Sequence, residues 1–183
     1  PVAIVDETAD LAKAVDDISD GASFDNNIMC ISEKCIVAVE SIVPAFVKQL
    51  EENGVYYIDN ETEMLQLTKT VLNHDMKMVR KMEGKSAMDI LEEAGIHPNR
   101  PVRLVVVRTF AKHPLVLEEC LMPVVPLVAV ADFEEALETA LFTEQGYRHT
   151  AMVHSQCIDR LSKAAKIMNT TVFIKNGSSL AGI

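Results

Sequence analysis

The sequence has no glycine-rich nucleotide-binding motif. Its seven glycines are spread singly along 183 residues, and neither GxGxxG nor a P-loop pattern occurs. The backbone turns that hold pyrophosphates in those motifs are therefore missing, and most of any dinucleotide site would lie outside this chain. HExxH, GxSxG and DxDxDG patterns are also absent, which argues against several hydrolase and metal-site classes.

Clustered metal ligands are lacking as well. The four cysteines (Cys30, Cys35, Cys120 and Cys157) form no CxxC pair, and only Cys157 has a histidine, His154, close by in the sequence. We therefore expect no metal site. No apolar run is long enough to span a bilayer, and no signal-peptide pattern is present. We expect a reduced cytoplasmic chain that does not bind a membrane.

The sequence has fewer basic than acidic residues. The chain has 17 basic and 27 acidic residues, a net charge of −10, and the acidic residues are scattered over the predicted helices. Nucleic-acid binding needs clustered Lys and Arg, so no nucleic-acid partner is expected. Small anionic ligands need only one local basic or amide-rich spot and remain compatible. The length and the 49% apolar content fit one well-packed domain.

The two ends of the sequence are unusual. The chain has no initiator methionine, begins in a strand-like run and stops directly after a glycine-bearing turn. We therefore interpret residues 1–183 as a single domain and as an internal piece of a longer protein.

Strand and helix periodicities alternate along the chain. The predicted strands are Val2–Asp6, Ile36–Val39, Val55–Ile58, Val102–Val107, Val124–Val130, Thr150–His154 and Thr171–Ile174; the predicted helices are Asp10–Ala22, Ile42–Glu52, Glu61–Leu72, Lys85–Ala94, Phe133–Phe142 and Gln156–Ile167. This order predicts an α/β fold with an open, mostly parallel sheet and helices on both faces. Pro126 favours an edge or a bulge for its strand. Such sheets bind ligands at the carboxyl ends of their strands.

Cys30, in FDNNIMCISEK, is the residue that most directly indicates chemistry. It closes a polar turn (Asp25, Asn26 and Asn27) and opens an apolar, strand-like run from Ile31 to Val39. A thiol at the exit of a turn has free backbone N–H groups nearby, which stabilise a thiolate and hold an oxyanion. Judged on its position alone, it remains either a nucleophile or a small packed side chain.

Three blocks in the same order resemble the catalytic domain of the aldehyde dehydrogenase superfamily. PVAIVDETADLAKAVDDISDGASFDNNIMC is similar to the strand, helix and turn before that family's catalytic cysteine, and EECLMPVVPLVAVADFEEAL to its Glu-Glu-x-Phe-Gly-Pro-Val block. GYRHTAMVHSQCIDRLSKAAKIMNTTVFIKNG is similar to the strand–helix–strand that follows. FDNNIMCISEK, RHTAMVHS and FIKNGSSLAGI most resemble the coenzyme A-acylating branch, of the ethanolamine- and propanediol-utilisation type. The resemblance covers nearly the whole chain and is weakest at residues 60–100.

The resemblance implies roles for three residues. Cys30 is the nucleophile, Glu119 holds the nicotinamide ribose, and Leu121 replaces a phenylalanine beside the nicotinamide. Met122 stands where hydrolytic members have glycine, which is a second departure from the wider superfamily. The alternative for Glu119 is a solvated carboxylate paired with a neighbouring cation, Lys112 or Arg108.

The remaining polar candidates keep two interpretations each. His149 and His154 flank a short strand, where either one orients a thioester or phosphate group or is a satisfied packed histidine. Asn176 is either a turn residue or part of a substrate tunnel. We expect the other three cysteines to be packing side chains.

The function implied by the resemblance is NAD-dependent oxidation of a short aldehyde (acetaldehyde or propionaldehyde) to acyl-CoA through a cysteine thioester. NAD is the cofactor and coenzyme A the co-substrate; the NAD-binding domain would lie outside the chain, so the piece alone would be inactive. The full enzyme would be a homo-oligomer, cytoplasmic or inside a bacterial microcompartment. Acid-forming aldehyde dehydrogenase, acyl-phosphate reductase and a non-catalytic α/β interaction domain remain alternatives.

Overall fold

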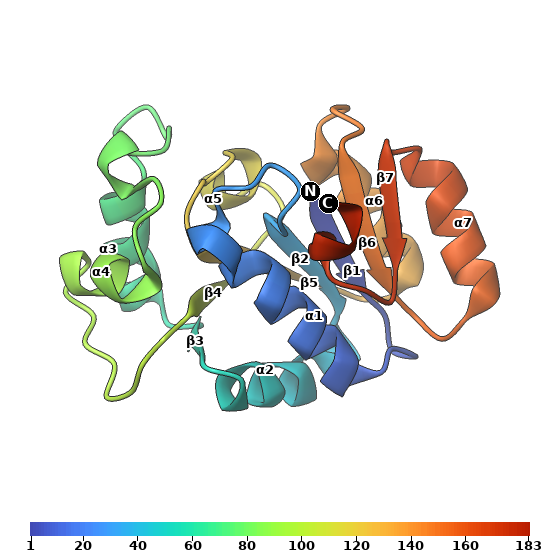
Figure 1. Ribbon diagram of the computed structural model, residues 1–183, viewed down its shortest axis with the longest axis horizontal. Coiled ribbons are helices and arrows are strands. Elements are labelled where there is room, and N and C mark those ends of the chain that lie inside the picture. Colours follow the sequence, from blue (N-terminus) through green and yellow to red (C-terminus); the bar gives the residue numbers. More distant parts are fainter.

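A computed structural model describes all residues, Pro1–Ile183. Seven parallel strands form one open sheet with helices on both faces, which confirms the predicted fold class (Figure 1). The strands are β1 (Val2–Val5), β2 (Cys35–Val39), β3 (Val55–Ile58), β4 (Leu104–Thr109), β5 (Val124–Val130), β6 (Thr150–His154) and β7 (Val172–Lys175). Their order across the sheet is β3-β4-β5-β2-β1-β6-β7. The sheet is therefore doubly wound, with β1 and β2 near its middle.

Seven α-helices and three short 3-10 turns connect the strands, and a fourth 3-10 turn follows β7. The helices are α1 (Leu11–Ser23), α2 (Val43–Glu52), α3 (Glu61–Val71), α4 (Ala87–Glu93), α5 (Pro114–Leu117), α6 (Phe133–Glu144) and α7 (Ile158–Met168); the 3-10 turns are η1 (Phe24–Asn27), η2 (Glu40–Ile42), η3 (Arg80–Met82) and η4 (Ser179–Gly182). The sequence pattern predicts all of the helices except α5, which is a single turn and too short to show a helical period. No helix has the length and apolarity that crossing a membrane requires.

The strands bury both of their faces. In β1, Ala3 and Val5 join the core beneath α1 and α2, whereas Val2 and Ile4 join the core beneath α6 and α7. This alternation is the two-residue period of an extended chain. A third core lies between the sheet and the α3–α4 pair, at the β3 end of the molecule (Figure 1). Near-continuous apolar strands such as β4 and β5 are what a sheet covered on both sides requires.

The strand β5 lies inside the sheet, between β4 and β2. Its pairing with β4 runs without a break from Val124 to Val128, and Pro126 stands opposite Val107. The prediction of an edge or a bulge at Pro126 is therefore wrong. Six of the seven residues of this strand are buried, so an edge position would expose apolar surface; the loss of one ladder N–H is the smaller cost.

Candidate functional site

The polar turn before Cys30 has an unusual backbone. Asp25, Asn26 and Asn27 all have positive φ angles, of 46°, 51° and 61°. The left-handed region is costly for most residues, and Asn and Asp enter it more easily because their short side chains bond locally. The turn ends α1 and reverses the chain toward β2. The residue types of the turn therefore explain its shape.

Hydrogen bonds close the base of the loop that carries Cys30, defined here as the Cys30 loop (residues 27–34). The Asn27 side-chain amide donates to the carbonyl oxygens of Ala22 (2.7 Å) and Glu33 (3.1 Å). The ammonium of Lys34 donates to the carbonyl oxygen of Asn27 (2.5 Å) and contacts its side-chain oxygen as well. The base of the loop is fixed, and Cys30 lies at its exposed tip.

The tip of the loop has unpaired backbone donors. The N–H groups of Met29, Cys30 and Ile31 have no hydrogen-bond acceptor. This confirms the expectation of free N–H groups beside the thiol, and such groups can hold an oxyanion. The strand-like run predicted from Ile31 is wrong in its first part, because β2 begins only at Cys35. The donors remain free because this segment is a turn and not a paired strand.

A half-buried cation that the sequence analysis did not assign, Lys34, lies within electrostatic range of Cys30. Burial lowers the pKa of Lys34 to about 8, while the negative charge of Glu119 acts in the opposite direction. Lys34 therefore joins the Cys30 loop electrostatically to the block around Glu119. Lys34 precedes a buried strand as many lysines do, so its sequence position alone gives no signal of this role.

Glu119 is exposed and has neither an ion pair nor a hydrogen bond. The alternative pairing with Lys112 or Arg108 is wrong, because Arg108 binds Glu40 at 2.7 Å and Lys112 has no carboxylate partner. An exposed, unpaired carboxylate can accept hydrogen bonds from a hydroxyl-bearing ligand. The structure thus leaves Glu119 available for the role that the resemblance implies.

Two hydrogen bonds of its backbone fix the position of Leu121. Its N–H donates to the sulfur of Met78 (3.2 Å), and its carbonyl oxygen accepts from the N–H of Gly84 (3.0 Å). The Leu121 side chain is half-buried, whereas the Met122 side chain is completely buried in the core beneath α3 and α4. Met122 therefore packs inside the protein, and Leu121 alone keeps a partly open surface.

The other cysteines differ from Cys30 in exposure. Burial raises the pKa of Cys35 and of Cys120 to about 12, so both thiols are inert packing groups at neutral pH. Cys157 is half-buried at the start of α7. Cys30 is the one exposed cysteine.

The two histidines lie at opposite ends of β6. His149 precedes the strand, and its Nδ1 is 2.6 Å from the hydroxyl of Thr150. His154 ends the strand; burial lowers its pKa to about 4, and its Nε2 has no partner. His154 is therefore a packed neutral histidine. His149 lies on the side of the sheet at which the strands begin, as Cys30 does.

The candidate residues gather at the amino edge of the sheet, which is the edge where the strands begin. The Cys30 loop precedes β2, Glu119 precedes β5 and His149 precedes β6. The expectation of a site at the carboxyl ends is therefore wrong for these residues. The helix-to-strand connections, and not the strand-to-helix ones, carry them.

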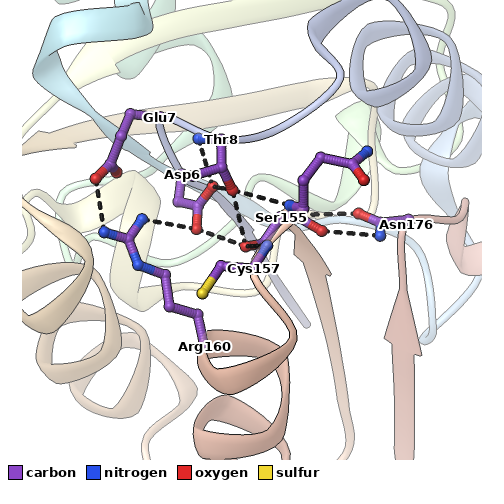
Figure 2. A network of polar contacts seen from close by, with 8 residues as sticks. Asp6, Glu7, Thr8, Ser155, Cys157, Arg160 and Asn176 are labelled. Atoms are coloured by element: carbon purple, nitrogen blue, oxygen red, sulfur yellow. Dashed lines mark hydrogen bonds and ion pairs between the residues drawn. The ribbon is translucent and has the colours of Figure 1, made fainter.

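The carboxyl edge is closed by a polar network (Figure 2). The buried Asp6 accepts from the hydroxyl of Ser155 (2.6 Å), from Thr8 (2.7 Å) and from Arg160 (3.0 Å). Burial opposes ionisation of Asp6, but these hydrogen bonds prevail and lower its pKa. Asn176, with a φ of 48°, pairs with both backbone groups of Ser155 at 2.9 Å. The network joins β1, β6, β7 and α7, and Asn176 acts as a turn residue.

A surface hollow lies away from the amino edge. The hollow has a volume of about 590 Å³ between α1 and α2, and none of the candidate residues lines it. No group of three or more His, Cys, Asp or Glu side chains has the geometry of a metal site. The candidate catalytic and binding residues Cys30, Glu119 and His149 thus lie at the amino edge and away from this hollow.

Comparison with known proteins adds independent information. A family model described as the aldehyde dehydrogenase family matches residues 2–181. The CoA-propanoylating propanal dehydrogenase of Salmonella typhimurium is 44% identical over the whole chain, which covers 39% of that protein. The acetylating acetaldehyde dehydrogenase of Escherichia coli is 37% identical, with 100% and 40% coverage. The chain thus spans about two-fifths of the length of the curated relatives it matches.

Solved structures agree with these matches. A propionaldehyde dehydrogenase of Rhodopseudomonas palustris with bound propionyl-CoA has a TM-score of 0.96 and 40% identity, with coverage of 100% of this chain and 40% of that one. A second structure of that enzyme holds CoA and an acylated cysteine. A propionaldehyde dehydrogenase from the fucose utilisation bacterial microcompartment of Clostridium phytofermentans has a TM-score of 0.95 and 36% identity, with 100% and 42% coverage.

Proposed function

This chain belongs to the aldehyde dehydrogenase family, and we propose that it is the nucleophile-bearing domain of an NAD-dependent, CoA-acylating enzyme. Its substrate would be a short aldehyde, acetaldehyde or propanal, and its product the acyl-CoA. One observation carries the proposal: the exposed thiol of Cys30 lies among three unpaired backbone N–H groups on a loop whose base is fixed. The relatives whose names specify CoA-dependent acylation support the choice of co-substrate.

In the first step, the Cys30 thiolate attacks the aldehyde carbonyl carbon. A carbon–sulfur bond forms, and the carbonyl π electrons move to oxygen, which becomes an oxyanion. The free N–H groups at the loop tip donate to that oxyanion, and the Lys34 ammonium adds positive charge nearby. Both features favour the thiohemiacetal over the free aldehyde.

In the second step, the tetrahedral carbon loses a hydride and becomes a thioester on Cys30. NAD, when bound, supplies the hydride acceptor. The unpaired carboxylate of Glu119 fits a role in holding ribose hydroxyls, and Leu121 would border the nicotinamide. The chain has no glycine-rich phosphate loop, so the NAD-binding domain lies outside residues 1–183 in this proposal.

In the third step, the CoA thiolate attacks the thioester carbonyl. A new carbon–sulfur bond forms, and the bond to Cys30 breaks, which returns the thiolate. His149 lies on the same edge of the sheet and is our candidate for orienting the thioester. We further propose a homo-oligomeric, cytoplasmic full-length enzyme, and enclosure in a microcompartment as its narrower location, by analogy with the Clostridium phytofermentans protein.

An assay of NADH formation by the full-length protein with propanal tests the proposal. We expect continuous NADH formation only when both aldehyde and CoA are present; without CoA, NADH formation should stop after a single turnover, with the acyl group left on the enzyme. Without CoA, mass spectrometry should find a propanoyl group on Cys30. Cys30→Ala should lower kcat about 1,000-fold or more, because the nucleophile is lost.

Cys157→Ala is the matched control, because Cys157 is half-buried at the other edge of the sheet and should keep full activity. Equal NADH formation with and without CoA would instead favour the acid-forming alternative. Full activity of a folded Cys30→Ala variant would contradict the catalytic assignment and leave the interaction domain as the better explanation.

A further inference from the structure

Glu33, three residues after Cys30, has a buried carboxyl group that none of the steps above uses. Its side chain is 0% exposed, and no cation forms a hydrogen bond with it. Instead, its two oxygens accept hydrogen bonds from Ser179, one from the backbone N–H (3.0 Å) and one from the hydroxyl (2.7 Å). Burial raises the pKa of Glu33 to about 7. Burial of a carboxyl group is unfavourable unless its new contacts compensate for the lost hydration.

The surrounding structure makes room for this carboxyl group. Gly21 lies in α1, and a β-carbon at that position would lie 2.2 Å from one oxygen of Glu33 and 2.5 Å from the hydroxyl of Ser179. Glycine weakens a helix interior relative to alanine. A glycine inside a helix and a buried carboxyl group are each unfavourable by themselves, and here the two lie against each other.

We propose that Glu33 is a positioning residue that fixes the Cys30 loop to η4 and thereby holds the thiol in its reactive place. This inference rests on the proposed function of Cys30. The contacts form a continuous path: Ser179 binds the Glu33 carboxyl group, and the Glu33 carbonyl oxygen accepts from Asn27 at the other end of the loop base.

The position of η4 explains why this anchor acts on the loop. The turn η4 packs against α1 and β7 near the end of the chain (Figure 1). A β-carbon on Gly182 would lie 3.9 Å from the Ile31 side chain, which directly follows Cys30. Glu33 thus contacts η4 directly, and the Ile31 side chain lies near it. Release of the carboxyl group would free one side of the loop base.

Displacement of a reacting group by about 1 Å lowers rates by about 100-fold, because the aligned approach is lost. We therefore expect Glu33→Ala to lower kcat about 10- to 100-fold while the KM for aldehyde changes less than about twofold. Glu33→Gln keeps an acceptor for the Ser179 N–H and a donor for its hydroxyl, so it should restore kcat to within about threefold.

The experiment uses the full-length enzyme and measures kcat, KM and the rate at which iodoacetamide labels Cys30. Ser179→Ala removes one of the two anchoring hydrogen bonds and should lower both kcat and labelling about three- to tenfold. Ser178→Ala is the matched control: it removes a hydroxyl from the same segment, one that bonds only the N–H of Leu180, and should change neither. This serine pair remains informative if Glu33→Ala does not fold.

The outcomes separate the two proposals. Loss of activity in Cys30→Ala establishes the proposed function independently of Glu33. With that established, a folded Glu33→Ala or Ser179→Ala enzyme with kcat and labelling within about twofold of wild type would overturn the positioning role. Equal losses in Ser178→Ala and Ser179→Ala would also overturn it, because the effect would then belong to the segment and not to the contact with Glu33.

Discussion

The side-chain amide of Asn26 donates a hydrogen bond of 2.9 Å to the carbonyl oxygen of Gly84. The N–H of Gly84 in turn donates to the carbonyl oxygen of Leu121 at 3.0 Å. One glycine therefore joins the turn before Cys30 to the block that contains Glu119. The link lies within residues 60–100, where the resemblance to the family is weakest.

Gly84→Ala should disturb this link. Gly84 has a φ of 69°, and a β-carbon there would lie 2.8 Å from the Ile28 side chain in the Cys30 loop. We expect a loss of about 1–2 kcal/mol in the free energy of unfolding from the left-handed backbone, with up to about 1 kcal/mol more from the contact. Iodoacetamide labelling of Cys30 should also change. Urea unfolding and labelling rates measure the two effects.

Gly95→Ala is the matched control, because Gly95 has a φ of 75° but no atom within 4 Å of a built β-carbon. It should lose only the backbone contribution and leave Cys30 labelling unchanged. Identical behaviour of the two variants would show that Gly84 does not act on the loop.

Gly21→Ala should destabilise the protein, although alanine in place of a helical glycine usually stabilises one. In most helix interiors this change stabilises a protein by about 0.5–1 kcal/mol. Here the new methyl group would overlap the Glu33 carboxyl group and the Ser179 hydroxyl. We expect a net destabilisation of about 1–3 kcal/mol, measured by urea unfolding. The loss should shrink in a Glu33→Ala background; an unchanged loss there would mean that the overlap is not the cause.

The fold can be predicted from the sequence because the signals for strands and helices are local. In β4, Leu104 and the three valines that follow it form an apolar run that indicates a buried strand without any knowledge of its neighbours. The place of β5 within the sheet is different, because strand order depends on burial across the whole molecule. Pro126 is a local signal, and it therefore leads to the wrong position for its strand.

The candidate site is only partly predictable for a similar reason. Cys30 and its polar turn are contiguous in the sequence, so the turn and the free N–H groups follow from local residue types. The contact between Glu33 and Ser179 joins residues 146 positions apart, and no local sequence pattern predicts it. The electrostatic proximity of Lys34 and Glu119 likewise exists only in the folded chain.

Lys34→Met should slow the reaction of Cys30 with iodoacetamide about tenfold at neutral pH. The physical reason is the loss of the ammonium group that fixes the base of the Cys30 loop through Asn27 and places positive charge near the sulfur. Labelling followed by mass spectrometry measures the rate for Cys30 alone. Lys175→Met is the control, because Lys175 is exposed at the opposite edge of the sheet and should leave the rate unchanged. Equal rates in Lys34→Met and wild type would remove Lys34 from the mechanism.

Two buried groups should give the free energy of unfolding opposite pH dependences. The pKa of Glu33 is raised from 4.5 to about 7, so the folded protein binds the extra proton and this contribution is full below pH 4.5 and lost as pH rises through 7. The pKa of His154 is lowered from 6.5 to about 4, so its contribution is full above pH 6.5 and lost as pH falls through 4. Each shift corresponds to on the order of 3 kcal/mol.

Between about pH 4.5 and 6.5, the pH dependences that Glu33 and His154 give to the free energy of unfolding have opposite signs and partly cancel in the wild type. Variants that remove one of the two groups should therefore show the contribution of the other. Relative to wild type, Glu33→Gln should gain stability as pH rises across this window, because the destabilising ionisation is removed. His154→Phe should instead gain stability relative to wild type as pH falls, because no buried imidazole must be protonated. Urea unfolding at several pH values gives both difference curves. Difference curves that are flat, or that slope in the same direction, would show that these groups do not titrate as their burial requires.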